Sequence, residues 1–144
     1  MKVIRATDTW QRAGVYYVRT EAMVRGFHIP LEKEFNEGDT PDTPYILVLD
    51  ELLPVGTCRI HFIPKKQYAK IERVCVIESH RNRGVGRQVI EAAEKWISEE
   101  GYHKVVITSR DEAVGFYQAL GYEPDFEYPL ESGVFHQVYM EKIL

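Results

Sequence analysis

The chain has 144 residues, a formal net charge of −4, and hydrophobic and charged fractions of 44% and 28%, close to the average of soluble globular proteins. A domain of this length buries roughly 70% of its unfolded surface, which is enough for a core and an internal cleft. No apolar run is long enough to span a membrane and no signal-like start is present, so we expect one domain over residues 1–144, in the cytoplasm and without a membrane partner.

The first third of the chain predicts a strand, a helix and a loop. Residues 2–7 read as a short strand, and residues 8–27 as a helix that is capped by Asp8 and ended by Gly26. One side of this helix is apolar and is expected to be buried; it carries Trp10, Val15, Val18, Ala22 and Met23. Residues 29–44 contain three prolines and clustered acids, which is typical of an irregular surface segment or a short helix.

Three strand-like runs follow, at residues 45–50, 54–64 and 69–78. The short turn between the first two runs favours an antiparallel meander. In the middle run apolar and polar residues alternate, which predicts a strand with one buried face. The buried face would carry Cys58, Ile60 and Phe62, and the opposite face Thr57, Arg59 and His61.

The second half of the chain predicts two helices, each followed by a strand. The longer helix covers residues 84–100, and its apolar face carries Val85, Val89, Ala92, Ala93 and Trp96. An apolar strand follows at 104–109, then a short helix from Asp111 to Gly121, and a last strand at 134–143. The order of these elements predicts a mixed α/β sheet covered by helices.

Neither a metal site nor a disulfide is indicated. Cys58 and Cys75 are the only cysteines and form no CxxC pair, so we interpret both as reduced core residues. The five histidines are scattered singly, without the spacing of a metal motif.

Charge is distributed unevenly along the chain. Residues 65–87 hold seven Lys or Arg against two Glu, a window of +5, whereas residues 32–51 hold seven carboxylates against one Lys. Nucleic acid usually needs a broader basic surface and an aromatic platform, and Tyr68 is the only aromatic residue in the basic window, so nucleic acid is not expected as a partner. A compact anion fits better. The acidic stretch could attract a cationic amine, but we interpret it as a solvated loop.

A strand, a glycine-spaced turn and a helix start coincide at residues 81–86, RNRGVG. The first amides of a helix have no internal acceptor and carry the positive end of the helix dipole, so they suit a phosphate. Gly84 and Gly86 would let an anion approach the backbone, and Arg81, Arg83 and Arg87 would add charge and forked donors. The alternative is a helix start with solvated arginines. Neither the P-loop nor the dinucleotide fingerprint matches.

Two motifs resemble the GNAT superfamily of acyl-CoA-dependent N-acyltransferases. Arg81-Asn82-Arg83-Gly84-Val85-Gly86 is similar to the family's [RQ]xxGx[GA] turn, and residues 113–122 are similar to its AxxFYxxxG[FY] segment. The resemblance covers nearly the whole chain. It implies a single GNAT-like domain with a mixed, mostly antiparallel sheet of about six or seven strands and about four helices, splayed into a V by a bulge in the fourth strand. Arg110 stands where many members carry Asn.

The resemblance also implies where coenzyme A binds. The turn at Arg81, Asn82, Arg83, Gly84, Val85 and Gly86, with Arg87, would hold the pyrophosphate, and Phe116 would belong to the same site. The backbone of Val74, Cys75 and Val76 would pair with the pantetheine arm and polarise the thioester carbonyl. The alternative is an apolar core strand, and both interpretations can hold because side chains and backbone face different ways.

Two candidate catalytic residues can be named, one from the resemblance and one from its place on the strand. Tyr117 resembles the general acid that protonates the departing thiolate, although packing on the apolar stripe of its helix would also explain it. Glu72 precedes Val74 on the same strand and could accept the amine proton directly or through water. As an alternative, Glu72 is an ion-pair partner of an arginine.

The sequence therefore predicts an acetyl-CoA-dependent N-acetyltransferase that acts by direct transfer on a primary amine of a small molecule or peptide. Acetyl-CoA would be the co-substrate, with no metal. The alternative is a catalytically idle acyl-CoA-binding sensor, which would keep the turn but use Tyr117 and Glu72 structurally. The family also allows a homodimer, and nothing in the sequence specifies the acceptor.

Overall fold

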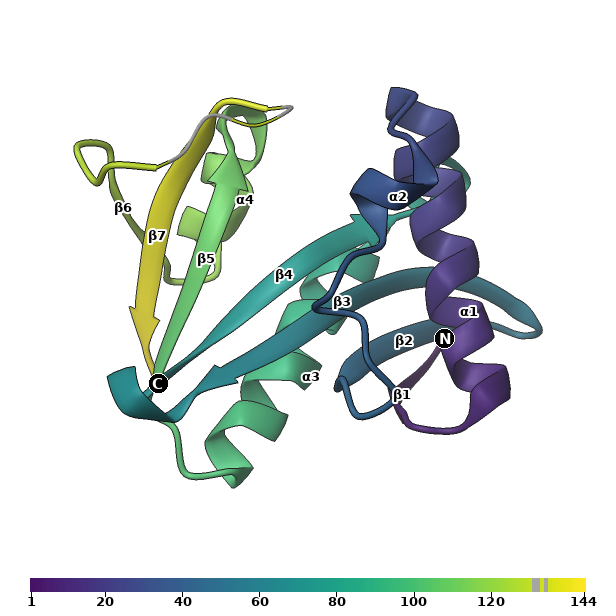
Figure 1. Cartoon of the computed structure of the whole chain (residues 1–144), viewed down its shortest axis with the longest axis horizontal. Helices are drawn as coiled ribbons and strands as arrows, with labels where there is room; N and C mark the ends of the chain where they lie inside the picture. The colour runs from purple at the N-terminus through teal and green to yellow at the C-terminus, as the bar shows by residue number, and fades with distance from the viewer. Residues whose placement is uncertain (131–132, 134) are drawn as a thin grey trace.

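Seven strands form one open sheet in the order β1-β2-β3-β4-β5-β7-β6, and every neighbouring pair except β4 and β5 is antiparallel (Figure 1). The computed structural model describes residues 1–130, 133 and 135–144. The strands are β1 (Lys2–Ala6), β2 (Tyr45–Asp50), β3 (Leu53–Ile63), β4 (Tyr68–Val76), β5 (Lys104–Arg110), β6 (Glu123–Asp125) and β7 (Gln137–Ile143). The mixed, mostly antiparallel sheet predicted from the sequence is confirmed.

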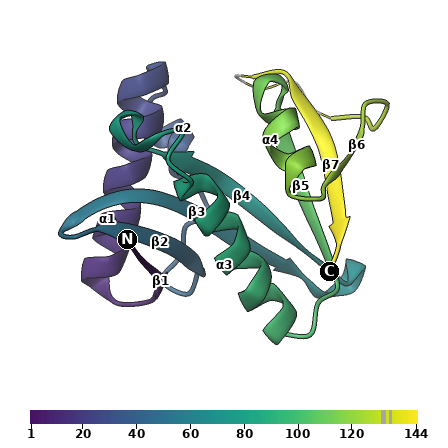
Figure 2. The ribbon, with the colours of Figure 1, turned by 180° about the vertical axis from the view of Figure 1, so that it is seen from behind.

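In the described residues, four α-helices accompany the sheet: α1 (Thr9–Arg19), α2 (Leu31–Glu34), α3 (Val85–Glu99) and α4 (Val114–Ala119). Helix α1 continues as a π-helical segment over Thr20–Arg25, so the single helix expected there changes type, and it extends through Phe27 instead of ending at Gly26. Helix α1 covers one face of β2, β3 and β4, and α3 covers the other face, as the view from behind shows (Figure 2). None of the helices in the described residues is both long and apolar enough to cross a membrane.

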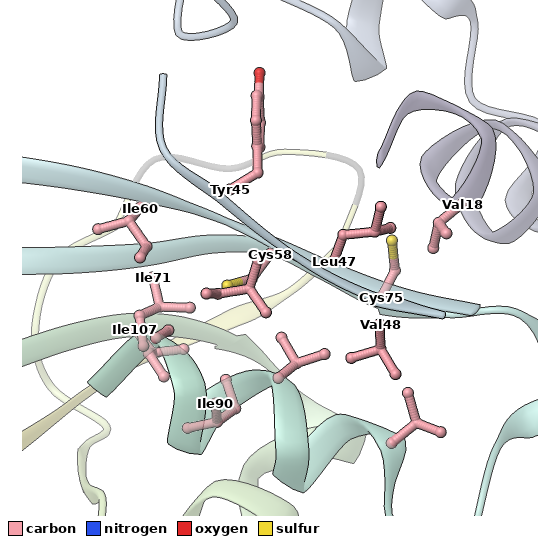
Figure 3. Close-up of a cluster of buried hydrophobic side chains, with 14 of the residues drawn as sticks. Val18, Tyr45, Leu47, Val48, Cys58, Ile60, Ile71, Cys75, Ile90 and Ile107 are labelled. Carbon is pink, nitrogen blue, oxygen red and sulfur yellow. The ribbon is translucent and has the colours of Figure 1, made fainter. Parts of the chain in front are cut away.

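The core lies on both faces of the meander (Figure 3). Cys75 points with Leu47 toward Val18 of α1, whereas Cys58 points to the α3 side, where Ile90 lies. Both cysteines are buried and free, as predicted. Burial raises the pKa of each thiol to about 12, so neither is a ready nucleophile at neutral pH.

Several details of the sequence prediction were wrong. Trp10 is 58% exposed, because a helix turns roughly 100° per residue and this position falls on the flank of the stripe formed by Val15, Val18 and Ala22. Thr57 and Arg59 are buried instead of exposed, since α1 and the segment after it cover that face of β3. The three-residue strand β6 was missed, and residue 134, where the last strand was expected to begin, lies outside the described residues.

The predicted V is confirmed and has a local cause. Thr57 of β3 pairs with Cys75 and Arg59 with Glu72, so Cys58 faces two residues of β4, which is a β-bulge. Arg73 at this bulge has φ +52°, in the left-handed region that non-glycine residues rarely occupy. The parallel pairing of β4 with β5 is confined to Ala69 with Val105 and Lys70 with Val106, and beyond it the two strands diverge (Figure 1).

Candidate active site

The divergence of β4 from β5 leaves one edge of β4 without a neighbouring strand over the described residues. Val74, Cys75 and Val76 lie on this part of β4, after the bulge. Backbone N–H and C=O groups of an unpaired edge can bind an extended ligand as a further strand would. The three residues expected to contact a pantetheine arm therefore lie where the backbone is free to do so.

The turn after β4 presents amides and arginines together. Arg81 Nε donates to the Val76 carbonyl over 3.0 Å, which fixes the start of the turn to the end of β4. The first hydrogen bond of α3 runs from Gln88 N to the Gly84 carbonyl, so the preceding amides at the helix start have no acceptor within the helix. Arg83 makes no ion pair within the described residues, and Arg87 pairs with Glu91 over 3.3 Å on the exposed face of α3.

The two glycines of the turn serve different purposes. Gly84 has φ +80° and no atom near the position of a missing Cβ, so it permits the left-handed turn and leaves its surface open. A Cβ on Gly86, in contrast, would lie 3.1 Å from the ring of Phe116. Gly86 is thus required by the packing of α4 against α3, and the open approach expected at both glycines holds only for Gly84.

A cavity of about 480 Å³ lies between the diverging strands β4 and β5, and α2 contributes to its lining. Its walls come from the segment after α1, from β4 and β5, from α4 and from the start of β7. Tyr117, Glu72 and Val74 are among the residues that line it, so the cavity brings three of the predicted site residues together. The others include Lys33, Glu34, Arg59, Lys70, Arg73, Ser109, Arg110, Phe135 and Gln137.

Helix α4 connects the turn with the cavity. Phe116 packs against the start of α3 at Gly86, and its ring lies 5.0 Å from that of Tyr117, which faces the cavity. Tyr117 is 6% exposed, and burial raises the pKa of its phenol. No wholly buried side-chain polar atom lacks a partner in the described part of the chain. The Tyr117 hydroxyl makes no hydrogen bond to another described residue, and Tyr117 lines the cavity.

Glu72 is held by an arginine, as its alternative interpretation predicts. Its Oε2 accepts hydrogen bonds from Arg59 Nε over 2.9 Å and lies 2.7 Å from Arg59 Nη2. Its Oε1 is 3.7 Å from His61 Nδ1 and 3.9 Å from Lys70 Nζ. One carboxylate oxygen is therefore committed to the ion pair, and the other remains available to a proton donor in the cavity.

A buried network of charges lies behind Glu72 and was missed by the sequence analysis. Arg19 is fully buried and pairs with Glu34 over 2.9 Å and with Asp39 over 2.6 Å. Asp39 also lies 3.2 Å from Arg59, so the network extends to Glu72. The interpretation of residues 32–51 as a solvated loop was thus wrong for Glu34 and Asp39. The signal available was Arg19 itself, a charged residue beside Val18 on the buried stripe of α1.

The network changes the ionisation of its members. Burial alone would raise the pKa of Asp39, but hydrogen bonds from Arg19, from the Tyr45 hydroxyl and from the Asn36 amide outweigh it and hold that pKa well below its usual range. For Arg19, burial is likewise outweighed by its two carboxylate partners, and the pKa is raised. Both groups stay charged across the physiological range, so the network fixes the segment around α2 against the sheet.

No cluster of three or more His, Cys, Asp or Glu side chains suited to a metal ion occurs among the described residues. His80 instead contacts Asp50 and Ser79 over 2.8 Å each, which anchors the short helix before the turn. The candidate site is therefore built from backbone amides, arginines, one tyrosine and one paired carboxylate.

Comparison with known proteins adds relatives to this geometry. Residues 8–122 match the model of the acetyltransferase (GNAT) family. The chain is 34% identical over 140 residues to YjcF of Bacillus subtilis (strain 168), which bears the name of an uncharacterized N-acetyltransferase, and the match covers 94% of this chain and 96% of YjcF. A solved structure from Lactobacillus plantarum superposes with a TM-score of 0.91 at 29% identity, over 99% of this chain and 97% of that one. An acyl-CoA N-acyltransferase from Pseudomonas aeruginosa shares the fold with a TM-score of 0.81 at 17% identity, over 99% of each chain.

Proposed function

The chain belongs to the acetyltransferase (GNAT) family, and we propose that it transfers an acetyl group from acetyl-CoA directly to a primary amine of a small molecule or peptide. One observation carries this proposal. The open edge of β4 leads from the arginine-rich turn to a cavity that contains Tyr117 and Glu72. A single extended thioester can therefore have its phosphates at the turn and its reactive carbon at the cavity.

The coenzyme site follows the same path. The amides at the start of α3, together with Arg81, Asn82, Arg83 and Arg87, suit a pyrophosphate because they combine the helix dipole with charged donors. The backbone of Val74, Cys75 and Val76 would then pair with the pantetheine arm. Gly84 has the open surface that the phosphates would approach, the backbone amides of Val85 and Gly86 would donate to them, and Phe116 packs on Gly86 from α4.

The chemistry assigns one role to each remaining group. An N–H donor from the β4 edge polarises the thioester carbonyl, whose carbon forms a bond with the neutral amine. The C–S bond then breaks, and Tyr117 donates its proton to the departing thiolate. Glu72 takes the proton that the amine loses, directly or through water, by its Oε1, which is not engaged by Arg59. The amide and free coenzyme A are the products, and Tyr117 regains a proton from solvent.

Direct transfer is favoured over a covalent acyl-enzyme. Cys58 and Cys75 are the only cysteines of the chain, both are buried, and burial raises each thiol pKa to about 12. The thiolate that would attack a thioester is therefore scarce at neutral pH. This supports the proposal that the amine itself is the nucleophile.

Release of free thiol from acetyl-CoA over a panel of amines tests the proposal against the idle sensor. We expect thiol release that depends on the amine and equals the amount of acetylated amine found by mass spectrometry. Tight binding of acetyl-CoA without turnover on any amine would favour the sensor.

The double substitution Arg81→Ala/Arg83→Ala is expected to weaken acetyl-CoA binding by more than about tenfold, since charge-assisted hydrogen bonds contribute roughly 1.5–3 kcal/mol each. Titration calorimetry at two salt concentrations measures this, and added salt should weaken binding to the wild type as well. Lys65→Ala/Lys66→Ala is the matched control, because it removes the same charge from exposed positions outside the turn. An unchanged dissociation constant in the folded double variant would contradict the anion site.

Substitution of Glu72 by Gln tests its role as the base. We expect turnover at neutral pH to fall by about tenfold, because the Gln side chain keeps the size of Glu72 but cannot accept the amine proton. The loss should shrink as pH rises and more of the amine is neutral. Acetyl-CoA affinity should stay near the wild-type value. A variant with the wild-type rate and pH profile would leave Glu72 as the ion-pair partner of Arg59 only.

A further inference from the structure

Building on the proposed function, we propose that the acceptor amine also carries an anionic group, a carboxylate or a phosphate, and that Arg73 and Arg110 bind this group in the cavity. The two arginines come from the two strands that form the V, β4 and β5, and both line the cavity beside Tyr117. An acceptor held between them would have its amine close to the end of the coenzyme path.

The charge of the cavity argues for such an acceptor. Among the described residues that line it, five are Lys or Arg and two are Glu. Both carboxylates are already paired, Glu34 with the buried Arg19 and Glu72 with Arg59. The lining therefore offers positive charge and no unpaired carboxylate within the described part, the opposite of a site for a cationic amine.

Arg73 occupies a position that suits few residues other than glycine or asparagine. Its φ of +52° lies within a strand, and a side chain in this left-handed region is strained. Its Nε donates to the Glu34 carbonyl over 3.1 Å and lies 3.6 Å from Glu34 Oε2, which orients the guanidinium, and its side chain remains 30% exposed. The described residues provide no hydrogen bond to its two terminal nitrogens. A forked, oriented and unoccupied donor pair matches a carboxylate or phosphate.

Arg110 is preorganised from the other strand. Its guanidinium carbon lies 5.0 Å from the ring centre of Phe27 and 5.1 Å from that of Phe135, and these two rings contact each other edge to face. The side chain is 32% exposed, and one of its nitrogens lies 3.3 Å from the exposed Glu112. Aromatic contacts hold the planar cation in place and leave its edges for an anion.

A basic cavity also favours the reaction itself. Positive charges near an ammonium group lower its pKa and increase the neutral fraction that can attack the thioester. The same charges would repel an acceptor that carries no anion. An anionic group on the acceptor attracts it to the basic cavity, and the surrounding positive charges favour loss of a proton from its ammonium group.

Binding of matched amines tests this inference without turnover. Chemical-shift titrations of the protein saturated with coenzyme A would compare β-alanine with β-alaninamide, and phosphoethanolamine with ethanolamine, with spermidine as a purely cationic amine. We expect at least one amine with an anionic group to bind about tenfold or more tightly than its match without that group. The first pair tests carboxylate and the second tests phosphate.

Variants assign the effect to the two arginines. Arg73→Ala and Arg110→Ala should each remove most of the preference for the anionic member, and Arg73→Lys should restore part of it. Arg25→Ala is the matched control, since this arginine is 73% exposed and outside the cavity lining. The inference would be overturned if the amines without an anionic group, or spermidine, bound equally or more tightly. It would also be overturned if no amine with an anionic group bound.

Turnover of the same amines with acetyl-CoA separates this inference from the proposed function. Anionic amines that bind selectively but are never acetylated would uphold the anion site and count against the transferase. If the two members of each pair, with and without the anionic group, were acetylated with equal kcat/KM, this would uphold the transferase and overturn the anion site.

Discussion

Replacing Tyr117 with Phe is expected to lower turnover by about 100-fold or more, while acetyl-CoA affinity and melting temperature stay close to those of the wild type. Phe preserves the ring that packs against Phe116 and Tyr122 and removes only the hydroxyl. Burial raises the pKa of this phenol, so the hydroxyl remains protonated at neutral pH and can donate to a thiolate. The measurement is kcat for the amine that the wild type acetylates fastest.

The donor thiol provides an internal control for this prediction. An acyl donor with a more acidic thiol needs less help in departure, so it should lose less activity in Tyr117→Phe than acetyl-CoA does. Tyr17→Phe is the matched control, because Tyr17 is 40% exposed and outside the cavity lining. If Tyr117→Phe keeps the full rate, the residue belongs to the core only, and water or the acceptor protonates the thiolate.

The second large effect concerns stability. Replacing Asp39 with Asn should lower the free energy of unfolding at pH 7 by about 3–5 kcal/mol, because it removes one partner of a buried charge and leaves Arg19 incompletely compensated. Asp39 is also the acceptor of the Tyr45 hydroxyl and lies 3.2 Å from Arg59, so the loss spreads through the network. Chemical denaturation followed by circular dichroism measures the change.

The pH dependence has a defined sign. The folded-state pKa of Asp39 is held below its usual value of about 4, so its contribution to stability is complete above that pH and is lost as pH falls through the folded pKa. The stability difference between wild type and Asp39→Asn should therefore shrink below about pH 4. Asp42→Asn, the same change at an exposed neighbour, should alter stability by less than about 0.5 kcal/mol. An equal effect of the two substitutions would show that the buried network contributes little.

Much of this fold follows from local patterns. The run at 45–50 coincides with β2, and the apolar stripe of the long helix places Val85, Val89 and Ala93 in the core, as predicted. The spacing of apolar residues and the residues at the turns are enough to predict such elements, because the pattern that shows which face is buried spans only a few residues. Strand β6 was missed because it has only three residues, one of them a proline, which is too short for an alternation of apolar and polar residues to be recognised.

The site was less predictable, for two physical reasons. The resemblance implied the bulge in β4, but the left-handed backbone of Arg73 results from the pairing of β3 with β4, which no local pattern contains. The ion pairs of Arg19 with Glu34 and Asp39 join residues 15 and 20 positions apart. In the sequence the acidic and the basic residues form separate runs, and only the fold determines which side chains form ion pairs. Because Glu34 and Glu72 are both paired with arginines, the cavity that they line is basic.

A crystal structure with acetyl-CoA tests the central claim most directly, because the claim concerns one continuous path from the turn to the cavity. We expect the pyrophosphate at the amides of residues 84–86 with Arg81 and Arg83, the pantetheine arm along Val74 to Val76, and the thioester within reach of the Tyr117 hydroxyl. The acetyl group should face the cavity that contains Arg73 and Arg110. Phosphates bound elsewhere, or a thioester closed off from that cavity, would contradict the account.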